Sequence, residues 1–250
     1  MAENPDIGAP PPPWRRLRFE ARAAASDEPA LASYIDAAIL SHDTICQALS
    51  FHLAEKLAGP EIGAQQIRHV IAHCYDHEPG LVEAAERDMQ AVLERDPACR
   101  GMLQPFLFFK GFLALQTQRV ANRLWREGRE TLAFHLQSRA SERFGVDIHP
   151  AVKMGSGVML DHATNITIGE TAEVGDGCSI LQGVTLGGTG KEVGDRVVVI
   201  DSDGYFTGDY QGAEGQALSD GAVKIVSETC NAIFGPGKEG GARTCKNLQE

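Results

Sequence analysis

The chain has 250 residues, of which 43% are hydrophobic and 23% are charged, and its formal net charge is -11. This length and composition allow one or two domains with a sizeable core, and they exclude an intrinsically disordered chain. The acidic balance offers no basic surface for nucleic acid and would be repelled by anionic membranes, so we expect neither partner.

The six cysteines are scattered without a C-x-x-C pair, and no run of eighteen apolar residues occurs. The cysteines therefore indicate reduced thiols in a cytoplasmic protein, and we expect no membrane span. Residues 1–14 are rich in proline and lack the apolar core of a signal peptide, which predicts a flexible arm.

Residues 15–145 show helical periodicity, with apolar side chains recurring at i, i+3 and i+4. Ser41 is the predicted N-cap of the second helix, Pro105 the predicted start of a long helix, and Gly128 and Gly145 the predicted stops of the last two. This pattern predicts an α-helical bundle. Its helices are expected near residues 31–39, 45–57, 62–77, 81–95, 105–127 and 131–144.

Three histidines, His69, His73 and His77, follow one another at i, i+4 spacing on a predicted helix. Such spacing can place imidazoles on one face for a metal ion. Without a supporting carboxylate, the pattern favours an ordinary solvated helix face, and we expect no metal site.

Residues 146–190 carry a six-residue repeat of aliphatic side chains, with one shift of two residues. A period of six fits neither the helical period of about 3.6 nor the strand period of about 2. It is typical of a parallel β-helix, whose successive coils must stack to bury the repeated side chain. The repeat positions are Ile148, Met154, Leu160, Ile166, Ile168, Val174, Ile180 and Leu186.

Polar side chains interrupt this repeat at Asp147, His149, Asp161 and His162. Histidine is the usual general base near neutral pH. Asp147 and His162 lie fifteen residues apart, which in a coil of three hexads predicts neighbouring positions on adjacent turns. The carboxylate could then accept the Nδ1 proton and leave Nε2 free as the base. The pair could equally be a structural polar pair that caps the coil.

The segments VDIHP, LDHAT, IGETA and SILQGVTLGGTGK, the last followed by GDR, resemble the serine acetyltransferase family. The resemblance covers about residues 15–196. It implies an α+β protein in which a helical oligomerisation domain (15–145) precedes a left-handed parallel β-helix (146–196). The implied reaction transfers acetyl from acetyl-CoA to the L-serine hydroxyl in cysteine biosynthesis.

The resemblance also assigns roles to individual residues. His162 would be the general base and Asp147 its orienting partner. Asp96 and Asp161 would contact the substrate ammonium, and Arg196 the substrate carboxylate, which its planar guanidinium fits.

Three glycines, Gly187, Gly188 and Gly190, would let the backbone approach the pantetheine arm of coenzyme A. The resemblance implies no metal, and it implies a homotrimer or a pair of trimers with active sites between subunits. It further implies a complex with cysteine synthase through a C-terminal isoleucine; this chain ends in Glu250, which argues against that complex.

The resemblance stops after Arg196. Position 197 is valine, where the family carries a second histidine in GDRHP, and residues 197–250 show no hexapeptide phase. This divergent tail is either an out-of-frame or otherwise substituted segment, or a lineage-specific C-terminus. Its only local pattern is a short helical one at Ala222–Val226. If the tail does not cap the last coil, the coil with Leu186 would fray and activity would be low or absent.

Three alternatives to an active serine acetyltransferase follow from these observations. One is another hexapeptide acyltransferase, acting on a sugar or homoserine. A second is an inactive assembly or regulatory form of the same family, which Val197 and the tail favour. A third is a zinc hydrase on a β-helix, which would need three histidines on adjacent coils where the repeat holds two.

Overall fold

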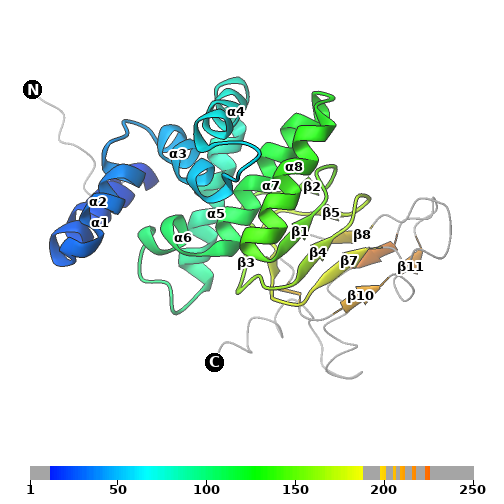
Figure 1. The fold of residues 1–250 in the computed structure, drawn as a ribbon. Helices are drawn as coiled ribbons and strands as arrows, with labels where there is room; N and C mark the ends of the chain where they lie inside the picture. The colour runs from blue at the N-terminus through cyan, green and yellow to red at the C-terminus, as the bar shows by residue number, and fades with distance from the viewer. Residues whose placement is uncertain are drawn as a thin grey trace, which may run out of the picture.

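The protein is described by a computed structural model that covers residues 12–187 and the backbone of five later strands. Those strands are β8 (Val198–Ile200), β9 (Tyr205–Phe206), β10 (Asp209–Gln211), β11 (Gln216–Ala217) and β12 (Val223–Ile225). The described part divides into a helical N-terminal region and a stack of short strands (Figure 1).

In the helical region, the structure confirms most of the predicted helices. Its first helix begins at Pro13, within the stretch expected to be a flexible arm, as proline is tolerated in the first turn of a helix. The elements are α1 (Pro13–Asp27), η1 (Pro29–Leu31), α2 (Ala32–Ile35), η2 (Asp36–Leu40), α3 (Ile45–Leu57), α4 (Ala64–His77), α5 (Gly80–Arg95), α6 (Leu103–Leu107), α7 (Lys110–Arg126) and α8 (Glu130–Phe144).

Two helix boundaries differ from the predicted ones. Thr44, not Ser41, caps α3: its backbone is extended and its Oγ1 accepts the Gln47 N–H at 3.3 Å, whereas the Ser41 hydroxyl donates to Asp36. The long helix predicted from Pro105 is two helices, because Phe109 is extended and separates α6 from α7. Gly128 and Gly145 do stop α7 and α8 with positive φ, as predicted.

The strands form three parallel sheets, one for each side of a β-helix. The strands within residues 146–187 are β1 (Val146–Ile148), β2 (Lys153–Met154), β3 (Met159–Leu160), β4 (Ile166–Ile168), β5 (Glu173–Val174), β6 (Ser179–Ile180) and β7 (Thr185–Gly187). The sheets are β1-β4-β7-β10, β2-β5-β8-β12-β11 and β3-β6-β9, and within the five-stranded sheet β11 pairs antiparallel with β12. Figure 1 shows β1 against α8, with β4, β7 and β10 following in order away from the helices.

The register locates the two-residue shift of the repeat. Ile148 pairs with Ile168, twenty residues on, whereas Ile168 pairs with Leu186, eighteen residues on. Leu160 and Ile180 also pair at a spacing of twenty. The first coil therefore holds two extra residues, and these lie in the corner between β3 and β4, which is residues 161–165.

The strands after residue 197 continue the stack beyond the predicted end of the β-helix. Strands β8, β9 and β10 pair in parallel with β5, β6 and β7, so the coil that contains Leu186 is covered. The predicted short helix at Ala222–Val226 is wrong, because Val223–Ile225 is strand β12 and pairs with β8. Cross-strand backbone pairing requires no particular side chain and therefore leaves little trace in sequence.

One continuous hydrophobic cluster runs from α1 through the bundle into the β-helix, from Leu17 to Leu186. All but one of the hexapeptide positions are buried, the exception being Met154, which is partly exposed. Because the core is shared, the helices and the coils are held in a defined relation to each other. No helix in the described part is long and apolar enough to cross a membrane.

A buried histidine inside the bundle makes stability depend on pH. His52 is 1% exposed, stacks on Phe106 at 5.6 Å, and burial, with Lys56 adding to it, lowers its pKa from 6.5 to about 4. Between these two values the unfolded chain binds a proton that the folded chain refuses, so the free energy of unfolding falls as pH falls. The full loss would be about 3 kcal/mol, of which about 2 kcal/mol arises between pH 7 and 5.

We therefore expect His52→Leu to reduce the difference in unfolding free energy between pH 7 and pH 5 by about 2 kcal/mol. Urea unfolding at both pH values measures it, with His77→Gln as the control because His77 is exposed on α4. An unchanged difference in the His52 variant would show that this group does not titrate on unfolding.

Candidate active site

The corner between β3 and β4 has an unusual backbone. His162, Ala163 and Asn165 have φ of 54°, 58° and 60°, a left-handed conformation that non-glycine residues seldom adopt. Each costs about 1 kcal/mol or more, and such strain clusters at functional sites. The corner is anchored at its start, where the Asp161 N–H donates to Ile180 O at 2.8 Å. His162 is exposed and Asp161 is half-buried.

The first turn of α7 holds both sides of this corner. Lys110 Nζ donates to Thr164 Oγ1, two residues after His162. At Gly111, an added Cβ would stand 2.0 Å from Leu160 O, which immediately precedes the corner. Only glycine permits so close an approach of α7 to β3. The conformation of the corner is therefore set by the helical region as well as by the coil.

Asp147 lies in β1, and the end of the 161–165 corner runs beside the start of this strand. The Asn165 N–H donates to Gly145 O at 2.8 Å, so the chain after His162 runs beside the residue two before Asp147. Asp147 is half-buried, and its Oδ1 accepts from Gln137 Nε2 of α8 at 2.7 Å. Among the hydrogen bonds of the described residues, none joins Asp147 to His162, so that predicted contact stays a prediction.

Asp96 comes from the helical region and lies between residues that pack on β3, the strand that leads into this corner. It is the C-cap of α5, and its Oδ1 accepts the Ala98 N–H at 2.8 Å, which fixes the carboxylate in a turn. Val92 and Cys99, on either side of it, pack with Met159, two residues before Asp161. A carboxylate from α5 and one from the coil therefore lie on adjoining elements, an arrangement suited to a ligand with a positive group.

Not all predicted site residues can be placed. Gly187 ends β7, and a Cβ there would meet none of the described residues within 4 Å. Gly188, Gly190, Arg196 and Val197 lie outside the described residues.

The other histidine of the repeat, His149, has a structural setting. Its ring lies 5.1 Å from Trp125 and 5.4 Å from Phe134, both edge-on, and its Nδ1 accepts the Ala151 N–H at 3.1 Å. It is therefore not placed as a partner of His162. Within the described ranges, no group of three His, Cys, Asp or Glu residues is arranged to hold a metal ion.

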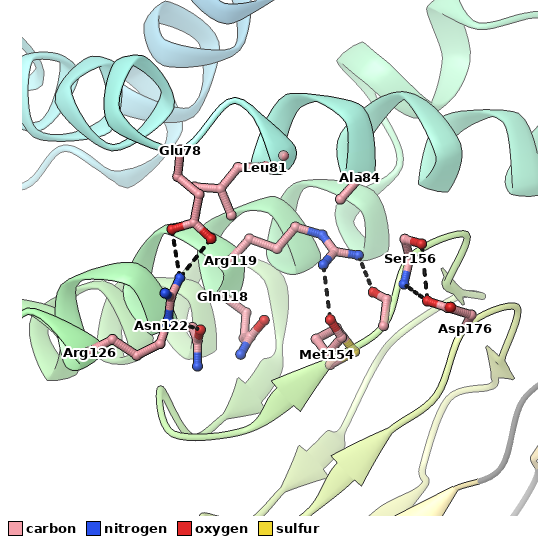
Figure 2. A pocket seen from close by; sticks show the side chains of 12 residues that line it. Glu78, Leu81, Ala84, Gln118, Arg119, Asn122, Arg126, Met154, Ser156 and Asp176 are labelled. Carbon is pink, nitrogen blue, oxygen red and sulfur yellow. Dashed lines mark hydrogen bonds and ion pairs between the residues drawn. The ribbon is translucent and has the colours of Figure 1, made fainter.

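A cleft of about 320 Å³ lies elsewhere, between α5, α7 and the corner that follows β2 (Figure 2). Its charged side chains are paired within its walls: Arg126 with Glu78 at 2.7 Å, and Asp176 with the Ser156 N–H at 2.6 Å. None of the predicted site residues within the described part of the chain lines it. The cleft is therefore separate from the corner that carries His162.

Sequence reasoning missed a buried ion pair at the back of this cleft. Asp88 of α5 is fully buried and accepts from Arg119 Nε and Nη2 at 2.9 Å, from Gln116 Nε2 at 2.9 Å and from the Val158 N–H at 3.0 Å. Arg119 in turn donates to Gly155 O at 2.6 Å and to Met154 O at 3.4 Å (Figure 2). Burial raises the pKa of Asp88, and the Arg119 guanidinium opposes that rise. The Asp88–Arg119 pair joins two helices to the first coil, and no local sequence pattern predicts it.

Comparison with known proteins identifies the family to which this architecture belongs. Residues 14–117 match the family described as "Serine acetyltransferase, N-terminal". The serine acetyltransferase of Salmonella typhimurium is 46% identical over 218 residues, which cover 85% of this chain and 80% of that protein. This chain belongs to the serine acetyltransferase family. The family accounts for the helical region followed by a left-handed β-helix of hexapeptide repeats, as predicted.

Further relatives show how far the family likeness extends. Serine acetyltransferase 4 of Arabidopsis thaliana is 51% identical over 185 residues, which are 74% of this chain and 52% of that protein. The chain thus spans about half the length of this plant serine acetyltransferase. A crystal structure of the Neisseria gonorrhoeae enzyme in complex with serine superposes with a TM-score of 0.76 at 43% identity, covering 78% of this chain and 80% of that one.

Proposed function

We propose that this protein transfers the acetyl group of acetyl-CoA to the hydroxyl of L-serine, giving O-acetyl-L-serine and coenzyme A. The observation that carries the proposal is the strained corner that holds Asp161 and His162 beside the elements carrying Asp147 and Asp96. The family relatives support the two substrates. The Neisseria gonorrhoeae structure contains serine, and a Brucella abortus serine acetyltransferase, 42% identical with a TM-score of 0.73, contains coenzyme A.

In the proposed mechanism His162 Nε2 takes the proton of the serine hydroxyl as the oxygen attacks the thioester carbonyl. Collapse of the tetrahedral intermediate breaks the C–S bond, and the departing thiolate of coenzyme A receives the proton from His162. Asp147 orients the imidazole. This role requires the Asp147 carboxylate to face Nδ1, and its bond to Gln137 holds one of its two oxygens while leaving the other available.

Substrate binding is assigned by charge. Asp96 and Asp161 hold the serine ammonium, and Arg196 holds its carboxylate. Gly187, Gly188 and Gly190 line the approach of the pantetheine arm. We further propose a cytoplasmic homotrimer or pair of trimers, in which neighbouring subunits complete each site.

The first experiment is an assay of thiol release with acetyl-CoA and L-serine, with the acetylated product identified by mass spectrometry. We expect serine-dependent thiol release, and far less with homoserine or a sugar as the acceptor. Strands β8–β10 cover the coil that holds Leu186, so loss of activity through fraying of that coil is not expected. A folded oligomer that releases no thiol with serine would refute the proposed function.

A further inference from the structure

Arg95, the last residue of α5, ties that helix to two successive coils of the β-helix. Its Nη1 donates to Gly157 O at 3.0 Å and to Gly177 O at 2.7 Å. These carbonyls belong to the same corner on consecutive coils, since the strands on either side pair at a spacing of twenty residues. Both glycines have positive φ, 66° and 72°. The same nitrogen lies 3.3 Å from Ser179 Oγ in β6.

These hydrogen bonds of Arg95, called the Arg95 anchor below, fix the position of the α5 C-terminus along the axis of the β-helix. A guanidinium nitrogen that contacts carbonyls from both coils cannot follow one coil without leaving the other. The bonds are partly buried, which shields them from competition with water. Two other contacts of α5 reach the first coil, the hydrogen bond from the Val158 N–H to Asp88 Oδ1 at 3.0 Å and the apolar packing of Val92 with Met159. Neither of these contacts includes a residue of the second coil, whereas Arg95 bonds to both coils.

The residue held next to this anchor is Asp96. The Asp96 carboxylate cannot turn freely, because its Oδ1 accepts the Ala98 N–H. The backbone of Asp96 is also held, because its N–H donates to Val92 O at 2.9 Å. The position of the Asp96 carboxylate therefore follows the position of the α5 backbone. The partner carboxylate, Asp161, belongs to the first coil, immediately after β3.

We propose that Arg95 is a positioning residue that sets the spacing between the Asp96 and Asp161 carboxylates for one substrate ammonium. The inference rests on the proposed function, because it takes the ammonium of serine as the group that the two carboxylates share. It predicts an effect on serine binding alone, since neither carboxylate is placed against coenzyme A. A residue that merely stabilised the fold would affect both substrates.

A double-mutant cycle between Arg95 and Asp96 tests the proposal. Arg95→Gln should raise the KM for serine about tenfold, leave kcat and the KM for acetyl-CoA within about twofold, and raise the serine Kd measured by calorimetry to match. In an Asp96→Asn background the same change should have little further effect, since the group it positions is gone. Arg95→Lys should retain part of the function, as a single nitrogen makes both bonds in the native protein.

Arg123→Gln is the matched control, because Arg123 is a half-buried arginine that pairs with Glu78 and Glu127, at the C-terminal ends of α4 and α7, and not with the coil carbonyls that Arg95 contacts. Equal losses for both substrates, or independent effects of the Arg95 and Asp96 changes, would overturn the proposal. If Arg95→Gln does not fold, Arg95→Lys carries the same cycle. A wild-type protein that binds serine without turnover would refute the proposed function but leave the cycle on Kd intact; no serine binding at all would overturn both.

Discussion

Replacing His162 by alanine is expected to lower kcat for acetyl transfer to serine by about 10²- to 10⁴-fold, the range that a positioned general base contributes. The expected loss is in kcat because, in the proposed mechanism, the imidazole takes the hydroxyl proton during attack. His162 is exposed at a corner whose fold depends on backbone bonds and on α7, so the thermal midpoint should change little. Thiol release at saturating serine and acetyl-CoA, with thermal unfolding of the same samples, measures both.

Two variants make this result specific. Asp147→Asn should also lower kcat, by a smaller factor, because it loses the orientation of the imidazole but keeps the base. His77→Gln, an exposed histidine on α4, should retain wild-type kcat. A positioned general base contributes at least about 10²-fold to kcat. If His162→Ala lost less than about tenfold in kcat, another group would have to take the proton.

The hexapeptide repeat was the most informative part of the sequence, and the two-residue shift that interrupts it was informative as well. Period and side-chain type predicted the coils, because each coil must bury one aliphatic residue at a fixed position. The two-residue shift after Leu160 corresponds to the strained corner that carries His162. The corner that we propose as the active site interrupts a structural repeat, and the interruption itself is visible in the sequence.

Other features had no local signal. Arg95 bonds to carbonyls 62 and 82 residues away, and Asp88 to a backbone N–H 70 residues away. Such partners are chosen by the packing of α5 on the coils, and a lone Arg or Asp on a helix reads as a solvated residue. The break between α6 and α7 was also missed. It falls at the extended Phe109, where the sequence Phe108–Lys110 has no glycine or proline to mark it.

Replacing Asp88 by alanine is expected to destabilise the protein by about 3–5 kcal/mol, the cost of leaving a buried charge without its partner. Arg119 is 6% exposed and would lose both of its bonds to the carboxylate, while the Val158 N–H and the Gln116 amide would lose their acceptor. Asp88→Asn should cost less, because its side-chain oxygen can still accept one or two of these bonds. Denaturant unfolding at a fixed protein concentration measures the difference.

The comparison that separates this pair from ordinary surface charges is Glu127→Ala. Glu127 pairs with Arg123 at 2.8 Å on the partly exposed side of α7, and such pairs are worth less than about 1 kcal/mol. Since α5 also carries Arg95 and Asp96, a loosened α5 in Asp88→Ala should raise the KM for serine at temperatures where the variant remains folded. A large stability loss with an unchanged KM would mean that the Arg95 anchor alone holds the end of α5 in place.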